Sequence, residues 1–205
     1  MIPRLTVSLL VALLFAAFAG RASAQEEEPP VGPGRVIELE VHGGGIRFED
    51  GGSRLAYGGR VGLRFPNGIG LGATATLAER AYEDELTGDD TEKADAAYYT
   101  ADLSYMLESV EPANIYGFLG AGVARYDPPP AHEALGVGKS TEIVIPVGLG
   151  ILWYAHGGSP WWGLRTEIRD NIVFLNGNEE LGTDDSIVSD WELAIGLSLL
   201  FGAYD

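Results

Sequence analysis

The chain is a small, strongly acidic protein without cysteine. Its 205 residues suffice for one domain with a sizeable core, and 30 Asp and Glu against 13 Lys and Arg give a formal charge of −17. Such a charge repels phosphate backbones, so we expect no nucleic-acid partner. The absence of cysteine excludes disulfides, thiolate metal sites and a cysteine nucleophile. The 29 glycines favour tightly packed β-structure with many turns.

Residues 1–24 have the three parts of a secretory signal peptide. Arg4 gives a positive start, residues 5–18 form an apolar run, and the small residues 22–24 precede Gln25. The apolar run is shorter than the roughly 20 residues of a spanning helix, which argues against a membrane anchor. We therefore predict cleavage after residue 24. Because Arg4 and Arg21 lie in this segment, the remaining chain keeps 11 basic and 30 acidic side chains, a formal charge of −19.

The next ten residues, 25–34, contain Glu26, Glu27 and Glu28 together with three prolines. Such a polar segment cannot bury enough apolar surface to order itself. We predict a flexible periplasmic lead-in over residues 25–34, followed by a single domain over residues 35–202.

Within this domain, apolar residues recur at every second position, the period of a β-strand. The C-terminal segment is typical, with an apolar face of Trp191, Leu193, Ile195, Leu197, Leu199 and Phe201 and a polar face of Asp190, Glu192, Ala194, Gly196 and Ser198. The same alternation predicts eight strands, around residues 37–42, 60–65, 69–77, 99–107, 115–126, 140–154, 162–169 and 190–201.

The connections between these strands alternate between short and long. Short links rich in turn residues occur at 66–68, 111–114 and 156–160. Long polar links are predicted at 44–53, 83–95, 127–138 and 175–187. One rim of turns and one rim of loops is typical of an eight-stranded antiparallel up-and-down transmembrane β-barrel, an all-β fold with its turns in the periplasm and its loops outside the cell.

A periplasmic, soluble, lipocalin-like binding barrel would also alternate, with its apolar stripes inside. The polar faces of this chain are dominated by Gly, Ala, Ser and Thr with a few opposite charges, which suits the narrow interior of a membrane barrel. Aromatic residues also gather around one turn, at Trp153, Tyr154, Trp161 and Trp162, as in an interfacial girdle. The membrane barrel is therefore favoured.

Three segments together carry a family resemblance: Trp162 to Asp170 (WGLRTEIRD), Phe118 to Val123 (FLGAGV) and Gly196 to Gly202 (GLSLLFG). They resemble the outer-membrane β-barrel domain family, which includes the small OmpA-like and OmpX-like barrels. The resemblance implies a monomeric barrel in the outer membrane of a Gram-negative-type bacterium, without shared catalytic residues. It also implies contacts with membrane lipids, including lipopolysaccharide, and with the outer-membrane assembly machinery, which would recognise Phe201 or Tyr204 as the C-terminal aromatic residue.

Charged residues on the polar faces predict a network inside the barrel. Its members are Glu38, Glu40, Arg60, Arg64, Asp102, Arg165, Glu167, Arg169 and Glu192. Closure of the barrel brings the last strand beside the first, so Glu192 could approach Arg165 or Arg169, and Glu38 could approach Arg60 or Arg64. The network is interpreted as a structural plug of paired charges, with a narrow polar pore for small solutes as the alternative.

Two long links are acidic and supply possible contacts to cations or to a partner such as a host, phage or matrix component. The residues concerned are Asp84, Glu85, Asp89, Asp90, Glu179, Glu180, Asp184 and Asp185. Their spacing matches no calcium-binding loop, so solvated loops are favoured over a metal site.

The three histidines, His42, His132 and His156, form no recognisable arrangement with a nucleophile and an acid in the sequence. We therefore expect neither enzymatic activity nor a cofactor.

Overall fold

The structure, a computed structural model, describes residues 35–49, 52–82, 92–110, 113–127, 139–154, 161–175 and 186–202. The described residues form eight strands. They are β1 (Val36–Phe48), β2 (Gly52–Arg64), β3 (Ile69–Tyr82), β4 (Glu92–Val110), β5 (Ala113–Asp127), β6 (Ser140–Tyr154), β7 (Trp162–Leu175) and β8 (Ser186–Gly202). The predicted signal peptide and lead-in lie outside the described residues.

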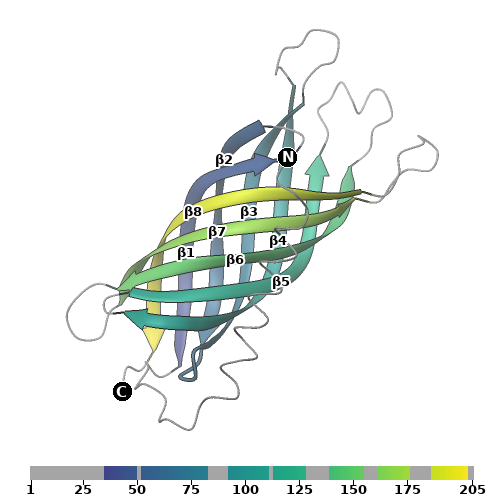
Figure 1. Cartoon of the computed structure of the whole chain (residues 1–205). Coiled ribbons are helices and arrows are strands. Elements are labelled where there is room, and N and C mark those ends of the chain that lie inside the picture. The colour runs from purple at the N-terminus through teal and green to yellow at the C-terminus, as the bar shows by residue number, and fades with distance from the viewer. Residues whose placement is uncertain are drawn as a thin grey trace.

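The eight strands form one closed antiparallel barrel in which each strand pairs with its neighbours in chain order (Figure 1). The barrel closes where β1 pairs with β8, from Val36 opposite Gly202 to Arg47 opposite Trp191. Closure leaves no edge strand, so the backbone amides and carbonyls of the wall bond within the sheet, as a lipid environment requires. The predicted fold class is confirmed.

The period of two in the sequence appears as an inward and an outward face on every strand. Large apolar side chains lie exposed on the outside. They are Ile37, Leu39, Val41, Leu55, Tyr57, Val61, Leu71, Leu77, Tyr99, Leu103, Val123, Ile143, Trp153, Trp161, Leu164, Ile168, Ile187, Leu193, Ile195, Leu197 and Phe201. Polar residues such as Glu38, Thr76 and Ser198 are buried in the interior. The lipocalin-like alternative requires the opposite orientation and is therefore wrong.

One predicted long link is instead part of two strands. Residues 44–53 were expected to form a loop, but β1 and β2 stay paired from Gly44 opposite Ala56 to Phe48 opposite Gly52, so only residues 49–51 connect them. The three glycines at 43–45 hide the alternation, because glycine has no side chain to mark a face. A Cβ at Gly44 would overlap the carbonyl oxygen of Leu193 in β8, so glycine permits a close approach of backbones here.

A second predicted link is shorter than expected. Strand β3 continues to Tyr82 and β4 begins at Glu92, so the connection spans residues 83–91 rather than 83–95. Polar residues at these strand ends look like loop in sequence, yet Glu79 still pairs with Asp95 in the ladder.

The short turn between β2 and β3 follows the prediction. The amide of Gly68 donates to the carbonyl of Phe65 over 3.1 Å, and Asn67 Oδ1 accepts from the amide of Ile69 over 3.2 Å. Gly68 has a φ of +79°, a conformation that favours glycine.

Candidate functional site

The structure places all nine residues of the predicted network in the interior, from Glu38 near the turn end of β1 to Glu192, which lies opposite Ile46 near the other end of that strand. Eight of them are buried, and the Arg64 side chain is 11% exposed. A charge inside a narrow barrel is costly unless it is paired and hydrogen-bonded. The contacts of each charge therefore decide what the interior can do.

Arg165 of β7 is the centre of the network. Its Nη2 donates to Glu38 Oε2 over 2.7 Å, its Nε lies 3.0 Å from Glu40 Oε2, and its Nη1 donates to Glu167 Oε1 over 3.1 Å. The guanidinium also lies 5.0 Å from the centre of the Tyr116 ring, and the Tyr116 hydroxyl donates to Glu167 over 2.7 Å. One guanidinium thus joins carboxylates of β1 and β7 and packs on an aromatic ring of β5.

Arg169 repeats this arrangement two residues along β7. Its Nη2 donates to Glu167 Oε2 over 2.7 Å, and its Nη1 lies 4.0 Å from Glu192 Oε2. Its guanidinium lies 5.2 Å from the centre of the Phe118 ring. Glu167 therefore accepts from Arg165 and Arg169, and its two oxygens are both used.

Two further arginines come from β2. Arg60 makes a two-pronged ion pair with Asp102 of β4, and its Nη1 also donates to Thr74 over 3.3 Å. Arg64 lies closer to the turns, where it donates to Glu38 over 3.3 Å and to the Tyr154 hydroxyl over 3.0 Å. Pairing a guanidinium with a carboxylate offsets much of the free-energy cost of burying the two charges.

The pairings match the sequence-based expectations in part. Glu192 approaches Arg169, and Glu38 approaches Arg64, as strand order suggested. Strand order did not suggest the pair between Glu38 and Arg165, which spans from β1 past β8 to β7. The barrel is narrow enough for long side chains to reach across the lumen. Residues on strands that are not adjacent can therefore form ion pairs, and strand order alone does not predict these pairs.

Glycines make room for the large interior side chains. A Cβ at Gly72 would overlap the Arg60 guanidinium, and a Cβ at Gly150 would overlap the Tyr116 ring and hydroxyl. The interior is thus filled by pairing a large side chain with a glycine on a nearby strand.

The half of the interior nearer the long links contains an apolar cluster together with buried polar residues such as Asn171 and Asp190. Its buried cluster consists of Ile46, Phe48, Ala56, Ala78, Ala96, Tyr98, Ala124, Tyr126, Val144, Val173 and Val188. Ile46, Val144 and Val173 are 0% exposed, so these side chains are fully enclosed by their neighbours. We call these eleven residues the apolar seal.

The two tyrosines of the apolar seal are held by a buried carboxylate. Tyr98 and Tyr126 donate to Asp190 Oδ2 over 2.7 and 3.3 Å, and their rings meet edge to face at 6.3 Å. The backbone amide of Glu49 donates to Asp190 Oδ1 over 3.2 Å, beyond the last ladder pair of β1 and β8. Asp190 therefore connects the apolar seal to the seam where the barrel closes.

Sequence reasoning missed the apolar seal. Ile46 and Phe48 fall in the segment 44–53, which was predicted to be a loop. Val144 and Val173 lie in predicted strands, but only charged residues were predicted to form an interior cluster. The signal was present, since each of these residues occupies the inward position of its strand's alternation.

His42 has a hydroxyl neighbour that the sequence did not reveal. Its Nε2 lies 3.3 Å from Thr76 Oγ1, and its Nδ1 lies 3.3 Å from Glu40 Oε1. A hydroxyl, an imidazole and a carboxylate in this order resemble a nucleophile relay. Thr76 is 0% exposed, however, so the group is enclosed by the wall and the other lumen side chains.

The predicted girdle around the turn from β6 to β7 has one member that points elsewhere. Trp153 and Trp161 are exposed on the outside, and the Trp161 and Trp162 rings lie 6.4 Å apart. Tyr154 instead turns inward, where it accepts hydrogen bonds from Arg64 and from Asn114 Nδ2, the latter over 2.6 Å. Its inward position in the alternation of β6 is the reason.

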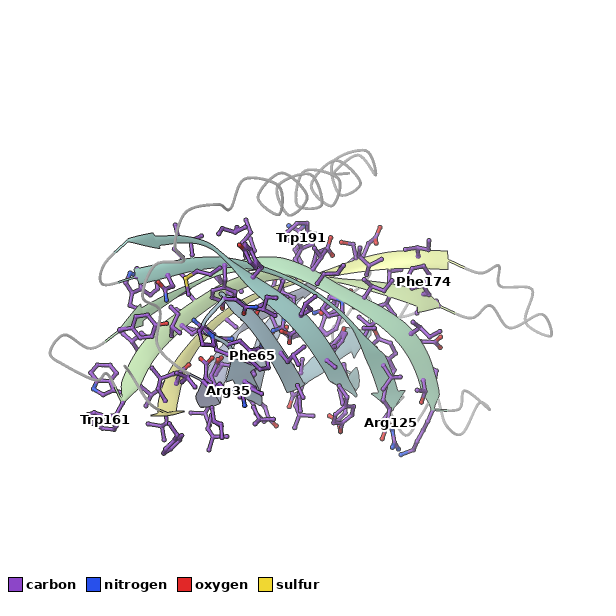
Figure 2. All side chains as sticks on the ribbon, turned by 90° about the horizontal axis from the view of Figure 1, so that it is seen from below. Arg35, Phe65, Arg125, Trp161, Phe174 and Trp191 are labelled. Atoms are coloured by element: carbon purple, nitrogen blue, oxygen red, sulfur yellow. The ribbon has the colours of Figure 1, made fainter. Side chains whose placement is uncertain are left out.

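The opposite end of the wall has a charged rim. Figure 2 shows Trp161 and Arg125 near opposite ends of the barrel. At the end of β5, hydrogen bonds from Lys139 and Arg125 to the Asp127 carboxylate lower its pKa below the usual range. The apolar belt therefore gives way to exposed charges where the long links begin.

Several predicted contacts lie outside the described residues: Asp84, Glu85, Asp89, Asp90, Glu179, Glu180, Asp184 and Asp185, as well as His132, His156 and Tyr204. Within the described ranges, no group of three or more His, Cys, Asp or Glu could hold a metal ion. In the part of the chain that the structure covers, no helix has the length and apolar character to span a membrane.

The closed eight-stranded barrel with an apolar outside and a polar inside has the fold of the small outer-membrane β-barrels, the class predicted from the sequence. Similar solved structures include Neisserial surface protein A (TM-score 0.53, 15% identity, 82% of this chain and 97% of that chain). They also include the attachment invasion locus protein of Yersinia pestis (0.54, 15%, 82% and 99%) and OprG from Pseudomonas aeruginosa (0.53, 16%, 84% and 99%). No protein-family model and no curated sequence matches the chain.

Proposed function

We propose that the protein is an integral outer-membrane barrel with a non-conducting lumen and a structural or surface-interaction role. The filled interior carries this proposal. The ion-pair network extends from the turns as far as Glu192, and the apolar seal lies nearer the long links, where its Ile46 is opposite Glu192. An ion that crossed the barrel would have to separate buried charge pairs and also displace the buried side chains of the apolar seal.

Planar-bilayer recordings test this proposal. We expect the full-length barrel to give no current steps above background. Truncating the apolar seal alone with Phe48→Ala and Tyr98→Ala should still leave the barrel silent, because the ion pairs remain. Adding Arg165→Ala to this double variant opens the second section and should produce steps. Steps from the unaltered protein would instead support the alternative, a narrow pore for small solutes.

The outward face supports location in the outer membrane, in contact with lipids that include lipopolysaccharide. A continuous apolar exterior is stable in hydrocarbon and unstable in water. We also propose that Phe201 is the aromatic residue read by the assembly machinery, since it lies exposed at the end of β8. Phe201→Ala should lower the amount of folded barrel in membranes, whereas Tyr204→Ala should not.

A surface-interaction role is supported by the names of two similar structures, a surface protein and an attachment invasion locus protein, the latter in complex with a heparin analogue. The links of this chain are acidic, so a sulfated ligand would be repelled and a cationic ligand is favoured. Replacing Asp84, Glu85, Asp89 and Asp90 by their amides should abolish salt-sensitive binding to a polylysine-coated surface. Unchanged binding would contradict a role for these residues, and the same replacement of Glu179, Glu180, Asp184 and Asp185 tests the other link.

We expect no enzymatic activity. The relay of Glu40, His42 and Thr76 is enclosed and lies beside a second carboxylate, Glu192, which would repel a developing oxyanion. Esterase or acyltransferase activity that is lost on His42→Ala would contradict this expectation.

A further inference from the structure

The outward apolar stripes of β7 and β8 continue past the level at which the other stripes end. On β1 to β5 the outward stripe ends in a polar residue near the long links, and these residues are Arg47, Ser53, Glu79, Asp95 and Arg125. On β7 the stripe is interrupted by Asp170 but resumes with Ile172 and Phe174. On β8 it is interrupted by Ser189 and resumes with Ile187. Apolar side chains therefore lie beyond a polar margin on these two strands.

The distance along the strands places these side chains outside the hydrocarbon. Phe174 is 12 residues beyond Trp162 at the turn end of β7, and Ile187 is 14 residues from Phe201 at the turn end of β8. With about 3.3 Å per residue and a tilt of about 40°, such a stretch rises roughly 30 Å or more, whereas the apolar band of a membrane barrel is about 25 Å tall. Asp170 rises only roughly 20 Å and lies near the margin of the band.

The apolar residues at this end of the wall are neighbours in the sheet. Phe174 pairs with Ile143 of β6 and with Ile187 of β8, and Ile172 pairs with Ile145 of β6. Ile143 and Ile187 are 60% and 55% exposed. We call these five residues the projecting face. A contiguous apolar surface in contact with water marks an interaction site.

The surroundings of the projecting face are acidic. Residues 170–191 contain six acidic residues and no Lys, Arg or His. The exposed side chain of Glu49 adds a carboxylate beside β8, where its Oε2 accepts from the amide of Ser189 over 2.7 Å. Arg47 of β1 is separated from β7 by Trp191 of β8. Charge complementarity therefore favours a cationic partner.

Asp170 lies at the foot of the projecting face, and one of its oxygens lacks a donor. Its Oδ1 accepts from Ser189 Oγ over 2.6 Å, whereas its Oδ2 is buried without a hydrogen-bond partner in the described part of the chain. The residue is 3% exposed. A buried carboxylate oxygen without a donor is unfavourable, and an ammonium or guanidinium group would supply the missing donor.

We propose that the projecting face binds a polypeptide segment in which Lys or Arg alternates with apolar side chains. The apolar side chains of this segment pack on Ile172, Phe174 and Ile187, and one of its cations contacts Asp170. The inference rests on the outer-membrane location and the surface-interaction role proposed above. It adds the chemistry of the partner and the part of the wall that the partner contacts.

The position of the projecting face relative to the membrane can be tested with a single thiol, because the chain has no cysteine. Ile187→Cys and Ile195→Cys place it at outward positions of β8 that are 55% and 60% exposed. In lipid nanodiscs, a charged maleimide should label the first variant rapidly and the second only after denaturation. Protection of both would overturn the proposal and leave the membrane location intact, whereas labelling of both would contradict the location itself.

Binding is tested with the Ile187→Cys barrel in zwitterionic nanodiscs, after its thiol is labelled with an environment-sensitive fluorophore. The probe is a short peptide of alternating Lys and Leu, and the control peptide has Glu in place of Lys. We expect a saturable change in fluorescence with the Lys peptide alone. Asp170→Asn should weaken this binding about tenfold, because it removes the acceptor of a charge-assisted hydrogen bond. Phe174→Ala should weaken it as well.

Asp127→Asn is the matched control, since Asp127 is a rim carboxylate of β5 outside the projecting face. It should leave the binding unchanged. Equal binding of the two peptides, or equal affinity of the Asp170→Asn and Asp127→Asn variants, would overturn the proposal. Oxidative crosslinking of two unlabelled Ile187→Cys barrels without peptide would instead assign the face to a second copy of the chain.

Discussion

At the scale of single residues, large side chains in the interior pack against glycines on adjacent strands. Tyr116 and Arg60 are large, and the strands beside them carry Gly150 and Gly72 where their atoms lie. The sequence shows the glycines and the large residues, but it does not show which glycine serves which side chain. Which glycine packs against which large side chain depends on the curvature of the closed barrel wall, because this curvature decides which interior positions lie close together.

Gly150→Ala should destabilise the barrel by about 1–3 kcal/mol, because its methyl group would overlap Tyr116 and displace the donor to Glu167. Gly43→Ala on β1 is the matched control, since the nearest atom to its Cβ, the carbonyl oxygen of Ala56, would be 3.8 Å away. Urea unfolding followed by gel migration of unheated samples measures both. Equal stability of the two variants would refute the size argument.

Arg165→Met should cost about 3–5 kcal/mol, because it leaves Glu38, Glu40 and Glu167 without their shared cation. Arg125→Met on the exposed rim removes an ion pair that water screens, and should change stability by less than about 1 kcal/mol. The same unfolding assay compares them. A loss for Arg165→Met no larger than that for Arg125→Met would show that the network does not stabilise the fold.

At the scale of strands, the sequence predicted all eight elements but misplaced the end of the first hairpin. Alternation is a reliable sign only where both faces carry side chains, and the glycines at 43–45 remove it. Ile46 and Phe48 resume the inward pattern beyond them and belong to the apolar seal. Pairing with β8 across the seam, which no local pattern encodes, keeps this stretch in the wall.

Phe48→Ala tests this extended hairpin. A residue in a loop would tolerate the change, whereas loss of a side chain that is 1% exposed should cost about 3–5 kcal/mol. Arg47→Ala, one residue earlier and outward, should have little effect. Similar small losses for both variants would favour the loop that the sequence suggested.

At the scale of the whole molecule, the outward belt decides the environment of the barrel. Leu197 lies well inside this belt on β8, and Phe201 lies at its end near the turns. Leu197→Arg should destabilise the barrel by roughly 2–4 kcal/mol in lipid, and Phe201→Arg by about 0–1 kcal/mol. Folding yields in vesicles measure the difference, and equal yields would argue that this face does not contact hydrocarbon.

The ion pair between Glu38 and Arg165 also carries positional information. If β1 slid by two residues along β8, every apolar side chain would still face lipid, so the exterior would accept the error. Because Glu38 and Glu40 are two residues apart, the slide would bring one of them to the place of the other and carry the second away from Arg165, which belongs to β7 and does not move with β1. One carboxylate would then lose its contact with this guanidinium. The lumen side chains therefore favour the observed register of β1 and β8, which the lipid-facing side chains alone would not distinguish from a register shifted by two residues.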